Sequence, residues 1–133
     1  MRTAIRRGDG DTLMIGQEHR RPIEILVEPA TTGSTSLMMG AQTLPPGAEI
    51  PLHQHVQEEI LFVYAGQARI TVAGVAHDVG PETAVFLPSN TLHRIENTGT
   101  GELRMTFTMS PPGYERFFRQ LAHAGADHAP ARS

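Results

Sequence analysis

The sequence predicts an all-β domain, a sandwich or barrel of short strands, with one amphipathic helix near the C-terminal end. Two observations support this fold class. Ten prolines and thirteen glycines are spread along the 133 residues and divide the chain into short segments. Within these segments apolar and polar residues alternate with a period of two, which is typical of half-buried strands. No repeat of ~20–50 residues is found, so a solenoid is not expected.

Seven segments have the residue pattern of strands. In residues 23–27 and 103–109 an apolar side chain stands at every second position. Turn-forming residues bound the segments: Pro-Pro-Gly at 45–47 closes one strand, and Ala-Gly at 73–74 connects two others. We expect strands at residues 23–27, 36–44, 60–64, 68–72, 75–79, 84–87 and 103–109.

The C-terminal part of the chain has a different period. From Tyr114 to Leu121, large apolar residues recur at the i, i+3, i+4 and i+7 spacing of one helical face. Gly125 is a suitable C-terminal stop for such a helix. We therefore expect an amphipathic helix at residues 114–123, whose aromatic face packs on the body of the protein. Residues 126–133 are expected to form a flexible tail.

The composition excludes several kinds of chemistry. The chain has no cysteine, so it has no thiolate nucleophile, disulfide or iron–sulfur cluster. It has no lysine, so Schiff-base catalysis is excluded. The net charge of −3 argues against a nucleic-acid platform and against a basic membrane-surface helix. No stretch approaches the ~20 apolar residues of a membrane span, and residues 1–10 lack a signal-peptide core. We expect a soluble, cytoplasmic protein.

A pair of histidines one residue apart is the first chemical signal. In a strand, residues i and i+2 point to the same face, so His53 and His55 can converge on one point. The same parity reaches Glu59, whereas Glu58 would point the other way unless a bulge intervenes. Two imidazoles and a carboxylate form a facial ligand set for a divalent transition metal. Taken alone, the His-x-His pair is equally compatible with two surface histidines.

The residues around His53 and His55 extend the pair to a longer pattern of five positions. Gly47, His53, His55, Glu59 and Gly66 follow the pattern G-x5-H-x-H-x3-E-x6-G. This pattern resembles the first motif of the cupin superfamily at every position.

A second cupin motif follows in part. Pro88, His93 and Asn97 stand at its spacing, but Glu82 and Asn90 replace its two glycines. Asparagine tolerates the left-handed backbone better than most residues with a Cβ atom, so the departure at Asn90 is mild. Glu82 is expected to alter the preceding turn while leaving the histidine in place.

The resemblance covers residues 36–109 and implies a small single-domain metal-binding cupin over residues 1–125. Its implied fold is the double-stranded β-helix, a jelly-roll barrel, with the helix added at the C-terminal end. It also implies one divalent transition metal per chain, for which iron, manganese, nickel, copper and zinc are all acceptable. The implied metal ligands are His53, His55, Glu59 and His93.

Strands that neighbour these ligands supply candidates for a substrate pocket, although core packing would explain each of them equally well. Glu59 is the candidate catalytic residue, as a ligand that can also act as a base. The pocket candidates are Met39, Gln42, Phe62, Tyr64, Phe86 and Met105.

Three functions are compatible with this site. The first is a metal-dependent oxidoreductase similar to the quercetinase-like dioxygenases, which would oxidise a small aromatic or enol substrate. The second is a non-redox cyclase, isomerase or lyase in which the metal acts as a Lewis acid. The third is a module that binds a metal or small ligand without turnover. Cupin folds serve all three, so the fold alone does not decide between them.

We also expect a homodimer, because exposed sheet edges need to be covered. Related small cupins commonly pair through their N-terminal strands, and Ile23, Ile25 and Val27 are apolar enough to form such a contact. A small-molecule substrate is the only other partner that the sequence suggests.

Overall fold

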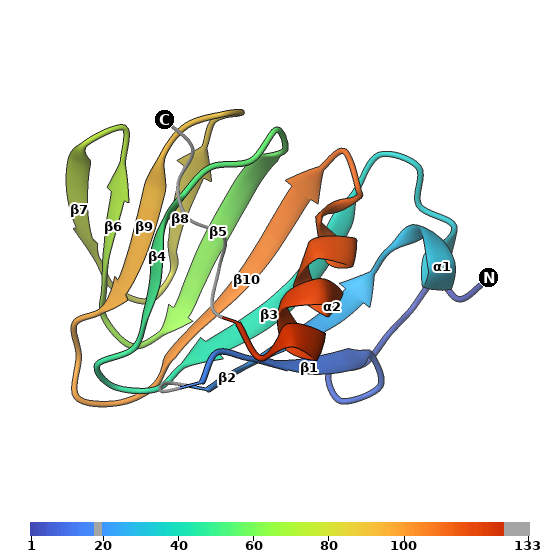
Figure 1. Cartoon of the computed structure of the whole chain (residues 1–133), viewed down its shortest axis with the longest axis horizontal. Helices are drawn as coiled ribbons and strands as arrows, with labels where there is room; N and C mark the ends of the chain where they lie inside the picture. The colour runs from blue at the N-terminus through green and yellow to red at the C-terminus, as the bar shows by residue number, and fades with distance from the viewer. Residues whose placement is uncertain (18–19, 127–133) are drawn as a thin grey trace.

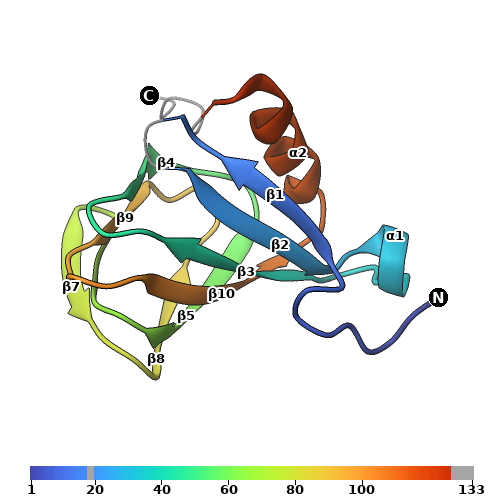
Figure 2. The same ribbon diagram turned by 90° about the horizontal axis from the view of Figure 1, so that it is seen from below.

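The computed structural model describes residues 1–17 and 20–126 and shows two antiparallel β-sheets packed face to face (Figure 1, Figure 2). The six-stranded sheet contains, in spatial order, β1 (Asp11–Ile15), β2 (Arg21–Val27), β3 (Met38–Leu44), β10 (Leu103–Ser110), β5 (Glu58–Ala65) and β8 (Thr83–Leu87). The four-stranded sheet contains β4 (Glu49–His53), β9 (His93–Asn97), β6 (Ala68–Val72) and β7 (Val75–Val79). This is the jelly-roll sandwich that the sequence predicted.

Three strands were not predicted from the sequence. Most of β1 is exposed on both faces, so it has no apolar alternation. The strand β4 contains Pro51, and β9 carries a histidine and an asparagine at two of its buried positions. Polar residues at inward positions conceal the pattern by which a strand is recognised.

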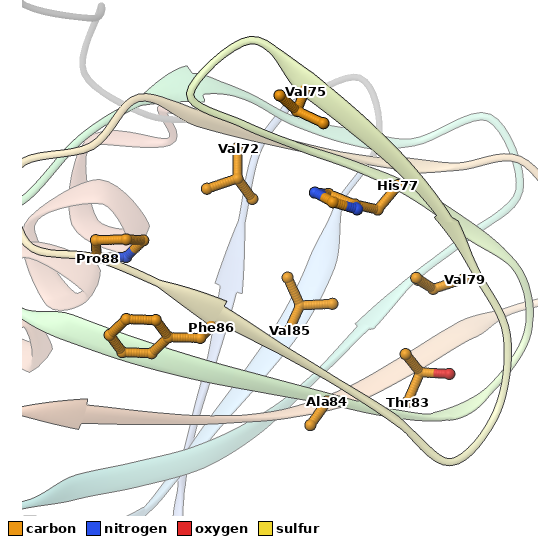
Figure 3. Close-up of a pocket in the computed structure, with 9 residues that line it drawn as sticks. All are labelled: Val72, Val75, His77, Val79, Thr83, Ala84, Val85, Phe86 and Pro88. Carbon is orange, nitrogen blue, oxygen red and sulfur yellow. The ribbon is translucent and has the colours of Figure 1, made fainter.

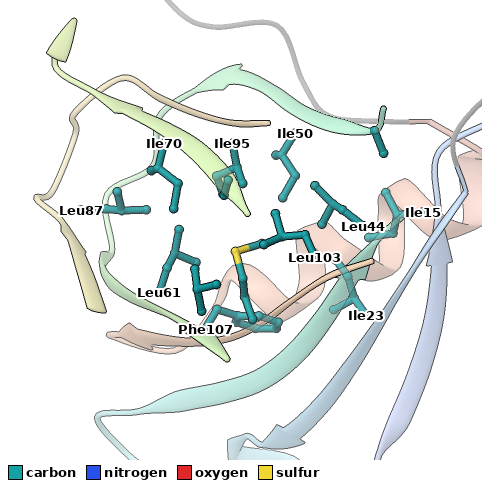
Figure 4. Close-up of a cluster of buried hydrophobic side chains, with 14 of the residues drawn as sticks. Ile15, Ile23, Leu44, Ile50, Leu61, Ile70, Leu87, Ile95, Leu103 and Phe107 are labelled. Carbon is teal, nitrogen blue, oxygen red and sulfur yellow. The ribbon is translucent and has the colours of Figure 1, made fainter. Parts of the chain in front are cut away.

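Apolar side chains from both sheets form a single core (Figure 4). Ile70 and Ile95 project from the four-stranded sheet toward Leu61, Leu103 and Phe107 of the six-stranded sheet, and all five are almost fully buried. Fully burying one such side chain stabilises the fold by about 1.5–3 kcal/mol. The core therefore holds the two sheets at a fixed separation, and it lies directly beside the histidines.

One glycine is required by close packing between strands. A Cβ atom on Gly40 of β3 would lie 2.3 Å from the carbonyl oxygen of Glu24 and 2.6 Å from the ring of Phe107. The two positions where the cupin motif expects glycine also have a positive φ, 64° at Glu82 and 54° at Asn90. The turns are therefore kept although both residues carry a Cβ atom.

The predicted helix is α2 (Tyr114–Ala124), which ends at Gly125 in the left-handed conformation. It packs beside β1 and covers one end of the sandwich (Figure 2). A single-turn helix, α1 (Pro29–Thr32), follows β2. Of the predicted tail, residues 127–133 lie outside the described residues, and the carbonyl of Ala126 accepts a hydrogen bond from Gly16 N at 3.1 Å. Within the described residues, no helix has the length and apolar character needed to cross a membrane.

Candidate metal centre

Three histidines converge at the end of the sandwich that α2 covers. His53 is the last residue of β4 and pairs with His93, the first residue of β9, while His55 lies in the loop after β4. All three side chains are buried, and one nitrogen from each lies within 4.8 Å of the others. Three buried histidines in this arrangement could hold a metal ion.

The backbone fixes the tautomer of each ring. Nδ1 of every histidine in the cluster lies within 2.7–3.0 Å of a main-chain carbonyl oxygen. A carbonyl only accepts hydrogen bonds, so each neutral ring carries its proton on Nδ1 and keeps a lone pair on Nε2. Nε2 is therefore the atom that each histidine offers to a metal. The acceptors are Pro51 for His53, Gln57 for His55 and Thr91 for His93.

Glu59 lies beside these rings. Its Oε1 is 3.0 Å from Nε2 of His55 and 3.9 Å from Nε2 of His93. The side chain faces the interior and is 5% exposed, whereas that of Glu58 faces solvent. The parity argument assumed one continuous strand, but β4 ends at His53 and β5 begins at Glu58. The structure brings the carboxylate to the histidines across a short loop.

Burial controls the charges in this cluster. Desolvation lowers the pKa of His53 to about 3, assisted by the nearby His93, and lowers that of His93 to about 4. Desolvation also raises the pKa of Glu59, against a hydrogen bond with His55 that lowers it. Neutral imidazoles are the form that binds a metal.

Two observations test whether these residues fit a metal ion. Among the described residues, Nε2 of His93 is buried without a hydrogen-bond partner, which is costly for a polar atom. In addition, Nε2 of His55 and the ionised Glu59 are both acceptors, so their 3.0 Å separation needs a shared proton or a cation. The donor set of imidazole nitrogens and one carboxylate therefore fits a divalent transition metal.

The cavity at this centre is very small, about 10 Å³. Tyr114 and Phe118 of α2 close it, and the ring of Tyr114 lies 4.7 Å from that of His55. Burial raises the pKa of the Tyr114 hydroxyl, and the charge of Glu59 adds to this effect. The lining residues are Gln42, Ile50, His53, Glu59, His93, Ile95, Met109, Tyr114 and Phe118.

Of the six pocket candidates, Gln42 lines this cavity. Phe62, Tyr64 and Phe86 are 38–54% exposed on the outer face of the six-stranded sheet, so the expectation that they face the histidines was wrong. Met105 is fully buried in the core and does not line the cavity. Met39 is half-buried, and its strand position places it on the face opposite to Gln42. The strands that carry these candidates have apolar residues on both faces. The sequence alone therefore does not show which of their side chains point inward.

Five residues of the cavity were not assigned to it from the sequence: Ile50, Ile95 and Met109 on strands, and Tyr114 and Phe118 on α2. The helical spacing of Tyr114 and Phe118 predicts a docking face. Their rings pack on one another with centroids 5.0 Å apart, and Phe118 also packs on Phe107 at 5.4 Å. The same rings also form the wall of the metal centre. No local signal in the sequence separates these two roles.

A second and larger hollow lies between β7 and β8, at the open edge of the sandwich (Figure 3). This groove has a volume of about 510 Å³ and shares no lining residue with the metal cavity. Valine side chains of β6, β7 and β8 surround it together with His77, and Phe86 and Pro88 lie at one end (Figure 3).

Comparison with known proteins places the motif region in a family. Residues 40–109 match the family model described as the cupin domain. Polyketide synthase CurC of Streptomyces cyaneus is 32% identical over 90 residues, which make up 67% of this chain and 58% of CurC. The chain spans 58–65% of the length of the first curated relatives that it matches.

Solved structures agree on the fold. Polyketide cyclase RemF of Streptomyces resistomycificus has a TM-score of 0.69 at 20% identity, covering 84% of this chain and 83% of RemF. A predicted oxalate decarboxylase of Thermotoga maritima has a TM-score of 0.73 at 20% identity, covering 81% of this chain and 98% of that one.

Proposed function

This chain belongs to the cupin domain family, and from that premise we propose that it is a metal-dependent enzyme that cyclises a small polycarbonyl molecule. The observation that carries the proposal is the cluster of His53, His55 and His93, whose Nε2 atoms face one point beside Glu59. Isomerase and lyase chemistry at the same centre belong to the same non-redox class.

We assign His53, His55, His93 and Glu59 as the protein ligands of one divalent transition metal per chain. Such an ion, when bound, supplies Lewis-acid polarisation of a carbonyl or enol oxygen. The Nδ1 hydrogen bonds to backbone carbonyls hold the rings in place and keep Nε2 free of a proton.

Among the residues that line the cavity, Glu59 carries the carboxylate. We therefore assign it as the general base that accepts a proton from the substrate. In an aldol-type cyclisation, a proton leaves the carbon beside a carbonyl and passes to the Glu59 carboxylate. That carbon then bonds to a second carbonyl carbon of the same molecule, and the proton returns to the oxygen formed there. No oxidant or reductant is consumed. The side-chain amide of Gln42 also lines the cavity and can orient a substrate oxygen.

The comparisons favour this chemistry over the oxidative alternative. CurC carries the name of a polyketide synthase protein, and polyketide chains have the closely spaced carbonyl groups that a cyclase needs. A dioxygenase acting on an aromatic or enol substrate would use the same four ligands, but none of the relatives reported above is named as one. The two functions differ in their need for oxygen and for a redox-active metal.

Metal exchange with and without air tests the proposal. The metal-free protein is loaded with zinc or with iron and is offered a linear poly-β-ketone. We expect the zinc form to release a cyclised, isomeric product under strict anaerobiosis. Turnover that requires both iron and oxygen would instead establish the dioxygenase.

The ligand assignment is tested separately by metal content. Glu59→Gln should weaken metal binding by about ten-fold or more, equivalent to ~1.4 kcal/mol, as measured by mass spectrometry after dialysis against a buffered metal. Glu58→Gln is the matched control and should retain the metal, because this side chain faces solvent. Equal retention by both variants would remove Glu59 from the ligand set.

We also propose that the chain forms a homodimer that acts on a small molecule. The contact cannot use Ile23 and Ile25 as expected, because both are fully buried within the chain. Light scattering at micromolar concentration should give twice the 14.5 kDa mass of one chain. A particle of 14.5 kDa would show a monomer.

A further inference from the structure

The metal cavity is too small for the molecule that the proposed function requires. A volume of about 10 Å³ corresponds to room for about one water molecule. Some part of its wall must therefore move before an organic substrate can reach the histidines. The walls are of two kinds, because most of the lining residues lie on strands and two lie on α2.

The strand walls are rigid. Ile50, His53, His93 and Ile95 lie on β4 and β9, which pair with each other. Glu59 lies on β5, which is hydrogen-bonded on both sides, to β10 and to β8. Moving any of these residues would break sheet hydrogen bonds and expose the core.

The two halves of α2 differ in how they are attached to the sheets. Arg119 in its second half donates hydrogen bonds to Asp11 at 2.9 Å and to Glu28 at 2.6 Å, which ties this part to β1 and to the residue after β2. The first turn begins after Gly113, whose φ of 137° only glycine adopts readily. Gly113 N donates a hydrogen bond to the buried Glu115 carboxylate at 2.6 Å, and this bond lies within the turn, so it does not tie the turn to a strand. Tyr114 lies in this first turn.

Tyr114 is also a phenol held against the metal centre. Its ring lies 4.7 Å from that of His55, and its other neighbours are the rings of Phe117 at 5.1 Å and Phe118 at 5.0 Å. A flat aromatic ring in the same place would find two of these partners, His55 and Phe118, at favourable ring–ring distances.

We infer that Tyr114 occupies the binding position of the substrate's own ring, and that a planar phenolic or enolised aromatic molecule binds there when the first turn of α2 moves outward. This inference rests on the proposed function and narrows it to a polycarbonyl substrate that already carries one enolised or aromatic ring, and this ring displaces Tyr114. Phe118 and the Arg119 ion pairs remain in place, so the second half of α2 stays docked. The substrate then lies between His55 and the aromatic face of the helix.

Titration with 2-naphthol tests the inference. The chain contains no tryptophan, so naphthol fluorescence is measured without tryptophan emission. Wild-type protein must displace Tyr114 before it binds, which lowers its apparent affinity. Tyr114→Ala should therefore bind 2-naphthol at least ten-fold more tightly than wild type. Tyr114→Phe retains a ring in that position and should stay within about three-fold of wild type.

Phe86→Ala is the matched control, because it removes an exposed aromatic ring that lines the groove between β7 and β8. We expect it to leave 2-naphthol binding unchanged. Weaker binding by Phe86→Ala, with no change in Tyr114→Ala, would place the ligand in that groove and overturn the inference. Absence of binding to wild type and Tyr114→Ala would overturn it as well.

Hydrogen exchange on the wild-type protein gives a result that does not depend on a variant folding. In the 2-naphthol complex, amides in residues 114–118 should exchange faster while those of β5 and β9 stay protected. Unchanged exchange at 114–118 would contradict the movement of the first turn. All titrations are repeated with metal-free protein, where the ratio between Tyr114→Ala and wild type still reports on Tyr114. Failure of the protein to bind zinc would thus count against the proposed function. Equal 2-naphthol affinities of Tyr114→Ala and wild type would count against this inference.

Discussion

Each histidine of the centre is prepared for metal binding by a backbone group two residues away. A carbonyl at position i−2 receives Nδ1–H of His53 and of His93, and the carbonyl of Gln57 does so for His55. The spacing of the motif therefore fixes the tautomer of each ring as well as the fold. These acceptors are main-chain carbonyl groups, which a side-chain substitution does not remove. The role of each histidine is therefore tested by replacing the histidine itself.

The buried histidines give the metal-free protein a pH-dependent stability. The folded-state pKa values of about 3 for His53 and about 4 for His93 lie below the value of about 6.5 expected in the unfolded chain. Between these values the unfolded state binds more protons, so the free energy of unfolding falls as the pH falls. Glu59 has a raised pKa and acts in the opposite sense. Because two histidines oppose one carboxyl group, we expect the free energy of unfolding to fall overall on acidification.

We predict that metal-free protein loses stability on acidification from pH 6 to pH 5, because the two buried histidines take up protons only on unfolding, and the loss is on the order of 1 kcal/mol. Urea denaturation at a series of pH values measures this slope. His93→Gln removes one of the two histidines and should flatten it. His77→Gln, at an exposed position on β7, should leave it intact. A slope that His93→Gln does not alter would show that other groups cause it.

At the scale of the element, the sequence predicted those strands and the helix whose apolar period is undisturbed. The strands β6 and β7 occur as expected, and α2 is one residue longer than its predicted range. The strands β1, β4 and β9 were missed because exposure, a proline or inward polar residues hide their alternation. Local pattern also could not show that Tyr114 faces a histidine, since that depends on how the helix docks.

The turn between β6 and β7 carries a residue that is not suited to its conformation. Ala73 and Gly74 have φ values of 50° and 80°, the left-handed pair found in type I′ hairpin turns. Alanine is disfavoured there, whereas asparagine is common. The Ala73 side chain is exposed, so a larger residue does not clash with the core.

We predict that Ala73→Asn raises the free energy of unfolding by about 0.5–1 kcal/mol. Urea denaturation midpoints at constant slope provide the measurement. Ala76→Asn, which places the same residue at an exposed position within β7, serves as the control and should give no gain. Equal stabilisation by both variants would mean that the turn conformation is not the cause.

At the scale of the whole molecule, the two motifs predicted more than any single strand pattern. The pairing of β3 with β10 joins residues about sixty to seventy positions apart, and no local rule predicts such a contact. Resemblance to the cupin motifs nevertheless gave the jelly roll, because the motifs include both the turns and the histidines. The resemblance could not predict that Phe62 and Phe86 lie on the outer face, because the motifs do not constrain those positions.

The proposed ligands connect the two sheets. His53 and His93 belong to the four-stranded sheet and Glu59 to the six-stranded sheet. A metal bound to all of them would be lost on unfolding, so metal binding and global stability are linked. At a free metal concentration of 100 times Kd the gain is about 2.7 kcal/mol.

We therefore predict that zinc at this concentration raises Tm by roughly 10 °C for a domain of this size, and that a chelator reverses the rise. Differential scanning calorimetry measures both. His93→Ala should reduce the shift strongly, because it removes a ligand from the four-stranded sheet, while His77→Ala should keep the wild-type shift. A shift of equal size in His93→Ala would mean that zinc stabilises the protein from a site elsewhere. A chelator that lowers Tm in wild type but not in His93→Ala would tie the stability of both sheets to this one centre.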